Sequence, residues 1–515
     1  MTIAITPFQP CALRPRPLAA CLAAALFAAA SLPSVAQTTR DTSWIRVRTD
    51  PAQRIFPQLP FARGSVPAPG ATIAVANCND DGPGSLRAAI TNAGDGDTID
   101  LTALTCSTIT LQTGAIQIPV DNLTVIGRSH GALAIDGNDA DRVFVHPYGG
   151  ALTLRAMTIR GGRDRTTGFH VAGGGCIASA GYLTIDDAVV TGCYAGGEGA
   201  YGGAVYAYSL TLSHSTLSGN VANGVHEATG TAAFGGAAFV YTLQFADSTV
   251  SGNRAVHHFN ASFNSYDIGG GIISVHGGSI VDSTIDSNYS QGRGGGLASF
   301  DDVVVSNSTF SGNVAATEIG GGLFLRWPST MQIGNSTLTA NHAGNGGGGI
   351  WLAATTSTMQ SSIVAGNSAG AGQIAELQDA AMLTLDGANN LIGASSPSIT
   401  LPADTLDADP RLAPLEHAGG PTRTHALLPG SPAIDAGNNL AGLAFDQRGD
   451  AYPRVYGASA DIGAFEQQAP RPGVVRTSVP TLSMWSLGLL VACLGGLGIV
   501  RRRMGQNSRR APNCS

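Results

Sequence analysis

Residues 202–220 read GGAVYAYSLTLSHSTLSGN, and residues 235–253 read GGAAFVYTLQFADSTVSGN. The two stretches share a Gly-Gly-apolar step, an alternating apolar segment, a Ser-Thr-apolar step and a closing Asn. The same order recurs through the middle of the chain at intervals of 25–35 residues. Repeats of this length are typical of solenoids and related arrays, in which one supersecondary unit stacks on the next.

Two sets of positions define the repeat. The Gly-Gly-apolar steps begin at Gly174, Gly202, Gly235, Gly270, Gly295, Gly321 and Gly348. The closing asparagines are Asn220, Asn253, Asn288, Asn313, Asn341 and Asn367, with Cys193 in the first place. An amide side chain both donates and accepts hydrogen bonds, so stacked asparagines are expected to form a ladder, while the glycines permit positive φ at corners.

The repeat predicts a right-handed, single-stranded parallel β-helix over residues 71–395. Short strands separated by Gly and Asn can bury their apolar sides only against neighbouring coils, and so much glycine makes a poor helix. A β-propeller also has repeats of tens of residues. It needs four antiparallel strands per repeat, however, and the shortest repeat units are too short for that.

The N-terminus is typical of a secretory signal, residues 1–36, followed by a linker, 37–70. Arg14 and Arg16 precede the short apolar run from Leu18 to Ala30, and Ser34-Val35-Ala36 offers small residues at a cleavage site. The alternative is an internal apolar helix. The run is too short to span a bilayer, and its flanks favour export.

The C-terminus carries a second apolar segment, Leu482 to Val500, which is uncharged and long enough for a transmembrane helix. Arg501, Arg502 and Arg503 follow it, which predicts a cytoplasmic tail, residues 504–515, and an ectodomain outside. A linker, residues 469–478, precedes the segment. The expected localisation is an exported, inner-membrane-anchored precursor that later reaches the cell surface or the medium.

Charge and cysteine usage agree with export. Residues 37–478 hold all 35 acids but 21 of the 28 arginines, a net charge of −14, and the chain has no lysine. This balance argues against nucleic-acid binding. Four of the eight cysteines fall in the ectodomain, where three pairings are open and the local pairs Cys78–Cys106 and Cys176–Cys193 are favoured. No CxxC spacing occurs, so neither a metal nor a cofactor is predicted.

Two stretches resemble modules of bacterial β-helix surface proteins. Residues 79–90, NDDGPGSLRAAI, with 96–101, GDTIDL, resemble the CSLREA-type opening, although Gly84 and Ala88 replace its Cys and Glu. Ser85 to Ala93 is expected to form a short helix over the open end of the first coil. Residues 419–437, 446–449 and 461–466 resemble the choice-of-anchor Q module, which implies a C-terminal cap over residues 396–468.

A third stretch resembles the IPTL-CTERM sorting signal, residues 479–503. It comprises Val479, Pro480, Thr481, Leu482 and Trp485 before the apolar segment and the arginine cluster, with Val479 and Ser486 replacing Ile and Gly. The resemblance implies processing by an exosortase-like protease of a Gram-negative cell. The alternative is a plain single-pass anchor.

Some parallel β-helices, including the pectin-lyase-like solenoids, cleave polysaccharides with carboxyl groups, so acid pairs in the sequence are candidate catalytic residues. Asp186-Asp187, Asp301-Asp302 and His276-Gly277 are the candidates. His276 precedes Asp301, the opposite of the polygalacturonase order, and lysine is absent, so no catalytic residue is predicted. Arg423, Arg448 and Arg454 lie among Asp435, Asp446, Asp461 and Glu466, which predicts ion pairs that pin this segment to the last coil.

Two long loops, residues 221–234 and 254–268, occupy equivalent places in successive repeats. They are expected to emerge side by side, since insertions in a solenoid gather on one face. Their candidate ligand-binding residues are His226, His257, His258, Phe259, Phe263, Tyr266 and Asp267. Adjacent histidines on one loop rarely converge on a metal, so His257, His258 and Asp267 are not predicted to form a metal site. The leading hypothesis is a non-enzymatic surface rod that adheres to glycans or surface proteins; the alternative is a polysaccharide lyase or hydrolase.

Overall fold

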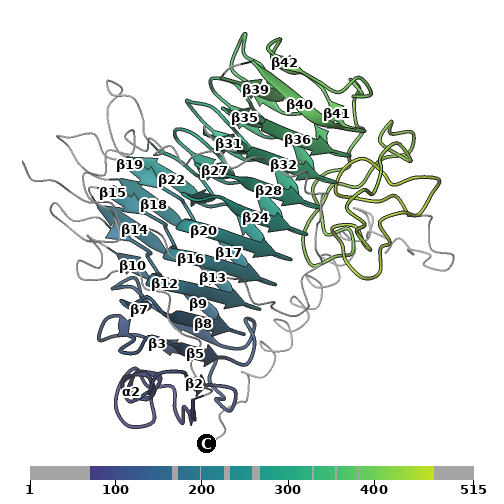
Figure 1. Ribbon diagram of the computed structural model, residues 1–515. Helices are drawn as coiled ribbons and strands as arrows, with labels where there is room; N and C mark the ends of the chain where they lie inside the picture. Colours follow the sequence, from purple (N-terminus) through teal and green to yellow (C-terminus); the bar gives the residue numbers. More distant parts are fainter. Residues whose placement is uncertain are drawn as a thin grey trace, which may run out of the picture. The chain divides into compact units, whose positions relative to one another are not determined.

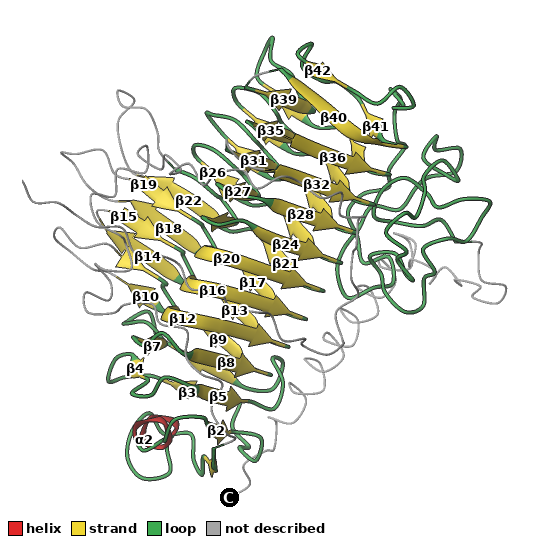
Figure 2. Ribbon diagram, viewed as in Figure 1, coloured by secondary structure: helices red, strands yellow, loops and turns green. Residues whose placement is uncertain are grey.

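The computed structural model describes residues 70–164, 172–197, 199–224, 232–257, 267–326, 330–353, 356–380 and 382–468 (Figure 1). Over these residues the chain winds into successive coils whose strands stack in four parallel sheets (Figure 2). The described part contains one helix, α2 (Leu86–Thr91). The predicted signal peptide, sorting signal and transmembrane segment lie outside the described residues.

Sheet 1 has 20 strands and forms one long side of the coils. Its strands are β1 (Thr72–Ala74), β2 (Asp97–Asp100), β4 (Ile116–Gln117), β5 (Leu123–Ile126), β7 (Phe144–His146), β8 (Ala151–Arg155), β12 (Ile177–Asp186), β16 (Val205–Ser213), β20 (Ala238–Ala246), β23 (Ile272–Ser274), β24 (Gly278–Val281), β27 (Leu297–Ser299), β28 (Val303–Ser306), β31 (Leu323–Leu325), β32 (Thr330–Gly334), β35 (Ile350–Leu352), β36 (Thr356–Gln360), β39 (Leu377–Asp379), β40 (Leu383–Ala388) and β42 (Ile399–Thr400).

Sheet 2 has 11 strands, one from each successive coil. They are β3 (Thr108–Thr110), β6 (Ala134–Asp136), β9 (Thr158–Arg160), β13 (Val189–Thr191), β17 (Thr216–Ser218), β21 (Thr249–Ser251), β25 (Thr284–Asp286), β29 (Thr309–Ser311), β33 (Thr337–Thr339), β37 (Ile363–Val364) and β41 (Leu391–Ile392).

Sheets 3 and 4 are shorter. Sheet 3 comprises β10 (Arg163–Asp164), β14 (Tyr194–Gly197), β18 (Val221–Gly224), β22 (Arg254–His257), β26 (Tyr289–Ser290), β30 (Val314–Ala315), β34 (His342–Ala343) and β38 (Ser368–Ala369). Sheet 4 comprises β11 (Ala172–Gly173), β15 (Gly199–Tyr201) and β19 (Ala232–Phe234).

Strands of successive coils pair in parallel and in register. Leu212 lies beside Phe245 in sheet 1, and Leu217 lies beside Val250 in sheet 2. These inward side chains are buried in one continuous apolar column. The prediction of a parallel β-helix is therefore confirmed, and the alternative of antiparallel propeller blades is excluded. The coils continue to β42, past the predicted boundary at residue 395.

Repeated residues adopt positive φ at the corners of the coils. Gly202 has φ +65°, and a Cβ there would lie 1.8 Å from the carbonyl oxygen of Val205, so only glycine fits. The corner between sheets 1 and 2 uses non-glycine residues with positive φ. This left-handed row comprises Ala156, Asp187, His214, Asp247, Asp282, Asn307, Asn335, Ser361 and Asn389. Most of its members are Asp, Asn or His, the residue types most tolerant of this conformation.

The asparagines form a buried ladder. From Asn220 to Asn341, each Nδ2 donates to the Oδ1 of the next Asn at 2.8–2.9 Å. Oδ1 also accepts the backbone N–H of the preceding ladder residue, as Asn220 does from Cys193 at 3.0 Å. At the far end, Asn367 Nδ2 donates to Glu376 at 2.5 Å. Burial raises the pKa of Glu376.

A second ladder, of serine hydroxyls, was not recognised in the sequence. Its members are Ser215, Ser248, Ser283, Ser308, Ser336 and Ser362. Each accepts the backbone N–H of the equivalent residue in the preceding coil at 3.0–3.2 Å. Their Ser-Thr steps are conspicuous in the repeat, but only the coil geometry shows that the serine hydroxyl points inward.

The N-terminal end of the coils agrees with expectation. Ser85 caps the N-terminus of α2, since its hydroxyl accepts the N–H of Ala88 at 3.2 Å, and Leu86 and Ile90 of the helix are buried in the core. Disulfides join Cys78 to Cys106 and Cys176 to Cys193. These are the two local pairs that the sequence favours.

The predicted cap lies elsewhere than expected. Residues 406–466, called here the lateral segment, run back along the outward face of sheet 2 instead of closing the last coil (Figure 1). Gln447 accepts from Thr309 at 2.6 Å, and the Ala464 N–H donates to Thr337 Oγ1 at 3.0 Å. The sequence predicted that ion pairs hold this segment against the last coil, and the predicted location is wrong. Arg423 pairs instead with Asp286 of β25, in the middle of the coils, at 2.6 Å.

The remaining charges of the lateral segment form a compact buried group. Arg448, 4% exposed in its side chain, pairs with Asp446 at 2.6 Å and lies between the rings of Tyr452 and Phe465. Arg454 is fully buried, 4.0 Å from Glu466. Asp435, Asp461 and Glu466 mainly accept backbone N–H groups, so the expected ion-pair network is only partly formed.

Candidate functional site

The two long loops leave the coils side by side. β18 pairs with β22 residue for residue, and Phe234 forms a parallel bridge with Ile268 where the loops return. His226, His258, Phe259, Phe263 and Tyr266 lie outside the described residues. Of the loop residues predicted to bind a ligand, the structure describes His257 and Asp267.

His257 and Asp267 face each other at the base of the second loop. Their side chains meet at 2.5 Å, and Asp267, fully buried, also accepts the N–H of Ala233 at 2.8 Å. The hydrogen bond to Asp267 raises the pKa of His257 against the opposing effect of burial. The pair therefore joins the bases of both loops. No group of three or more potential metal ligands occurs among the described residues.

Aromatic side chains cover the outward face of sheet 1 beside these loop bases. Tyr206 and Phe239 lie in adjacent coils with ring centroids 5.7 Å apart, nearly parallel. Tyr201 and Phe234 of sheet 4 stack 4.8 Å apart over them. These four rings are buried in a second apolar cluster, distinct from the column inside the coils.

A partly exposed line of rings runs next to this cluster. We call it the aromatic row: Tyr182, Tyr208, Tyr241 and His276, one from each of four successive coils. Neighbouring ring centroids are 5.8, 5.7 and 5.8 Å apart. Tyr208 and Tyr241 are stacked at 27°, whereas Tyr182 stands at 82° to Tyr208. The repeat gives little sign of the row, because Tyr182 lies eight residues after Gly174 whereas Tyr208 and Tyr241 lie six residues after Gly202 and Gly235.

The structure brings His276 and Asp301 together at the end of the row. His276 Nδ1 lies 4.0 Å from Asp301 Oδ2, with side-chain exposures of 54% and 13%. Asp301 also accepts the N–H of Asp302, and Asp302 accepts the N–H of Thr330, each at 2.8 Å. Both acids of this pair thus have structural partners at the turn.

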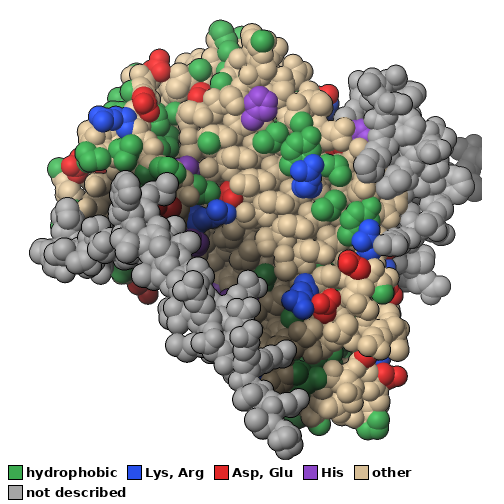
Figure 3. All heavy atoms as spheres, turned by 180° about the vertical axis from the view of Figure 1, so that it is seen from behind, with side chains coloured by type: hydrophobic (Ala, Val, Ile, Leu, Met, Phe, Trp, Pro, Cys, Tyr) green, Lys and Arg blue, Asp and Glu red, His purple; other side chains and the backbone are tan. Residues whose placement is uncertain are grey.

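The other acid pair lies at the corner between sheets 1 and 2. Asp186 pairs with Arg155 at 3.0 Å and accepts from Ser213 at 2.8 Å, and Asp187 meets His130 at 3.2 Å. Asp187 belongs to the left-handed row, which accounts for an Asp there without catalysis. Over the face seen in Figure 3, charged side chains are scattered and separated by wide uncharged areas.

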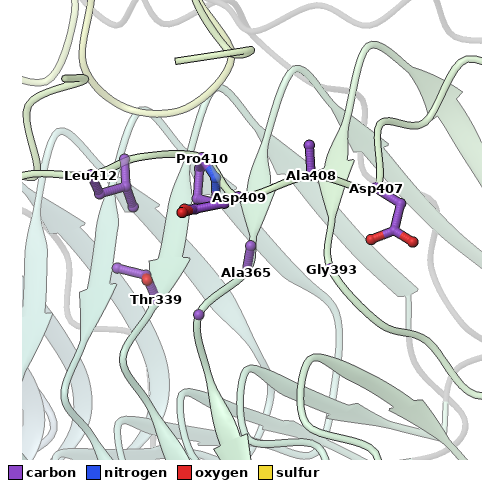
Figure 4. A pocket seen from close by; sticks show the side chains of 9 residues that line it. Thr339, Ala365, Gly393, Asp407, Ala408, Asp409, Pro410 and Leu412 are labelled. Carbon is purple, nitrogen blue, oxygen red and sulfur yellow. The ribbon is translucent and has the colours of Figure 1, made fainter. Parts of the chain in front are cut away.

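A cleft of about 480 Å³ lies where the lateral segment begins to cross sheet 2 (Figure 4). Its lining includes Thr339 and Ala365 from the coils and Asp407, Asp409 and Leu412 from the lateral segment. Asp407 lies at one end of the lining and Leu412 at the other. The polar side chains that line the cleft therefore do not converge on one point, as those that orient a small ligand do.

Fold and terminal sequence together define a class: a parallel β-helix protein with a C-terminal sorting motif. Residues 477–503 match the model of the IPTL-CTERM motif. No sequence among the curated proteins matches the chain. A solved structure described as the crystal structure of pectate lyase Pel9A is similar over 78% of this chain and 97% of that one, with 15% identity and a TM-score of 0.33.

No helix among the described residues is long and apolar enough to cross a membrane. The predicted segment 482–500 lies outside those residues, so its helical conformation stays a prediction. The predicted residues of the sorting signal also lie outside the described residues. They are Val479, Pro480, Thr481, Leu482, Trp485, Arg501, Arg502 and Arg503.

Proposed function

We propose that this protein is exported, sorted through its C-terminal motif and displayed as a rigid β-helix for adhesion or contact with the envelope or matrix. The observation that carries the proposal is the IPTL-CTERM match at residues 477–503, directly after the described coils and lateral segment end. The proposed partners are an exosortase-like protease and, through residues 482–500, the inner membrane of a Gram-negative cell. The C-terminal part of the fold is proposed to be a choice-of-anchor Q module.

Sorting is tested at the C-terminus of the mature protein. Mass spectrometry of the surface-shaved protein is expected to show loss of the residues after about Pro480. A variant with Pro480→Ala and Trp485→Ala is expected to keep the tail and stay in the inner-membrane fraction, whereas Tyr289→Ala, far along the chain, is processed normally. Surface-exposed protein that still ends at Ser515 would contradict the proposal.

Adhesion is proposed to involve the face bearing the two long loops. Support comes from their adjacent bases and from the His257–Asp267 contact that joins them. Replacing residues 225–231 and 258–266 with short Gly-Ser linkers, while keeping His257 and Asp267, is expected to abolish binding on a glycan array. Unchanged binding would remove the loops from the proposal.

A polysaccharide lyase or hydrolase is the second candidate, and the proximity of His276 to Asp301 favours it. Glycoside hydrolysis needs two carboxyl groups at a set separation, and lyases need a base with acids that bind calcium. Incubation of the protein with pectin and alginate distinguishes the candidates. Product release that is lost in His276→Gln or Asp301→Asn would establish the enzyme; intact polymer favours the rod.

A further inference from the structure

We propose that an apolar patch of the lateral segment lies against the outer surface of the bilayer that holds the C-terminal anchor. We call it the lateral patch: Leu440, Phe445, Val455 and Tyr456. The inference rests on the proposed function, because it takes residues 482–500 to be a membrane anchor. It adds a second, peripheral contact between the folded part of the protein and the same membrane.

Exposed apolar side chains are concentrated in the lateral segment. Among the described residues, seven large apolar side chains are exposed, and five of them belong to this segment: the lateral patch and Leu428. The other two are Tyr148 and Met382. The four residues of the patch are 37–68% exposed. Single exposed apolar residues are ordinary, whereas a group of them marks an interaction surface.

The patch is built on two antiparallel stretches of backbone. Phe445 forms an antiparallel bridge with Pro453, and the N–H of Arg454 donates to the carbonyl of Ala444 at 3.1 Å. Along the second stretch the side chains alternate, since Arg454 is fully buried and Val455, the next residue, is exposed. The backbone therefore holds these apolar side chains on the outward side of the segment.

The patch is also joined to the coils and to the last residues of the described chain. Asn307 Nδ2 donates to the carbonyl of Phe445 at 3.2 Å, and the N–H of Tyr456 donates to Glu466 Oε1 at 2.9 Å. Groups that are already ordered lose little conformational entropy when another surface covers them. The patch is thus fixed in place, beside the point from which the chain continues toward the sorting motif.

The length of this continuation identifies the occupant of the patch. Residues 469–481 separate the described chain from the apolar segment 482–500, which lies inside the matched IPTL-CTERM motif. A chain of this length reaches at most about 45 Å, and roughly 20 Å on average when it is flexible. An anchor in the bilayer therefore keeps the patch at a high effective concentration next to the membrane, where a weak apolar contact is enough.

The charges around the patch favour a neutral lipid surface. From Gly437 to Ala460 the one exposed charged side chain is Asp450, because Asp446, Arg448 and Arg454 are buried. The patch has no exposed cation to attract anionic headgroups, and the acidic net charge of residues 37–478 opposes them. Phe and Tyr rings are favoured at the interface of a bilayer, where the ring meets the acyl chains and a phenol reaches the headgroups.

The test is hydrogen–deuterium exchange of the full-length protein in phosphatidylcholine nanodiscs. A protease site inserted after Gly473 allows the folded part to be released from its anchor in the same sample. Amide exchange in residues 438–446 and 450–458 is expected to be at least threefold slower before release than after it, because the bilayer excludes water from the patch. Exchange in β16 is expected to be the same before and after release. High salt is expected to leave the protection intact, because apolar burial is not screened.

The variant Leu440→Ser, Val455→Ser, Tyr456→Ser is expected to exchange at the same rate before and after release. These three side chains are exposed, so the variant is expected to keep the wild-type melting temperature. Met382→Ser is the matched control. It removes the most exposed large apolar side chain of the described residues, next to β40 and outside the lateral segment, and is expected to keep the wild-type difference.

Protein that enters nanodiscs without protection of the patch overturns the docking, as does a serine variant that keeps the protection. Released wild-type protein that dimerises where the serine variant stays monomeric, measured by light scattering, shows that the occupant is a second copy and also overturns it. Protein that does not enter nanodiscs overturns the anchoring on which the inference rests. The failure of the anchor and the failure of the docking are thus read separately.

Discussion

Sheet 2 presents nearly the same outward residues along most of its length, but two parts of it have different surroundings. In β17, Thr216 and Ser218 are partly exposed. In β29, Thr309 and Ser311 occupy the equivalent positions and are buried, because the lateral segment covers them. Inward residues are set by stacking between coils alone. Whether these outward residues are buried depends on a segment that lies more than 100 positions away in the sequence.

The covered part is joined mostly through polar contacts. Thr309 donates to Gln447, and Ser311 lies 2.8 Å from the Nε2 of His425. Only towards the end of the coils do Ile363 and Leu391 replace hydroxyl residues, and there they pack against Leu427 and Ile462. A buried polar interface is stable only when every group finds a partner, so it specifies one docking register.

The largest effect is expected for Arg448→Ala in the lateral segment. The guanidinium is almost fully buried between two rings and paired with Asp446, so its removal leaves a buried carboxylate without its cation. Loss of about 3–5 kcal/mol in the free energy of unfolding is expected, with ligand binding unchanged. Urea denaturation measures it.

Arg155→Ala is the control for that substitution in the uncovered part. Its side chain is 57% exposed and pairs with Asp186, and exposed pairs contribute little. A stability change under about 1 kcal/mol is expected. Equal losses in the two variants would show that the lateral segment is not held as described.

The second effect is a pH dependence that arises at Asp282 in the covered part. Burial raises the pKa of Asp282 from 3.8 to about 7, and the facing carboxylates of Asp247 and Asp446 add to the shift, against a hydrogen bond from Asn307. The folded state then binds more protons than the unfolded state between about pH 4 and 7. The contribution of Asp282 to stability is therefore largest in acid and falls as pH rises through this window.

Asp282→Asn tests this assignment without disturbing the backbone, because Asn already occupies the same left-handed row at Asn307 and Asn335. It is expected to reduce the difference in unfolding free energy between pH 5 and pH 8 by about 2 kcal/mol. Asp187→Asn, exposed in the uncovered part of the same row, should leave the difference unchanged. An Asp282→Asn variant that keeps the same difference between pH 5 and pH 8 as the wild type would refute the assignment.

The same contrast explains what the sequence could and could not predict. Stacking is a local, repeated constraint, so Gly202, Asn220 and the interval between repeats were enough to predict the coils and the asparagine ladder. The position of the lateral segment depends on single long-range hydrogen bonds, such as that from Thr309 to Gln447, which leave no periodic signal. The one available clue was the change from Thr to Ile363 and Leu391 at outward positions.

The candidate site was harder still to predict. His276 and Asp301 were singled out, but their contact depends on the register between adjacent coils. Tyr182 sits at a bulge where its strand shifts register, so it is offset from Tyr208 in the repeat although the rings meet in space. Sequence periodicity fails at such irregular positions, and they are where solenoids depart from their repeats.

The smallest expected change in the free energy of unfolding comes from the same substitution in the covered and the uncovered part of sheet 2, Thr309→Val and Thr216→Val. The residues stand at equivalent positions of β29 and β17, and valine keeps the shape and β-propensity of threonine. In the covered strand the substitution leaves Gln447 Oε1 without its 2.6 Å donor, at a cost of about 1–2 kcal/mol. In the uncovered strand the hydroxyl of Thr216 is partly exposed, so its removal leaves no buried group without a partner. A change within about 0.5 kcal/mol is expected there. Urea melts of the two variants measure the difference directly. If both lose the same amount, the burial of sheet 2 by the lateral segment is not what distinguishes its two parts.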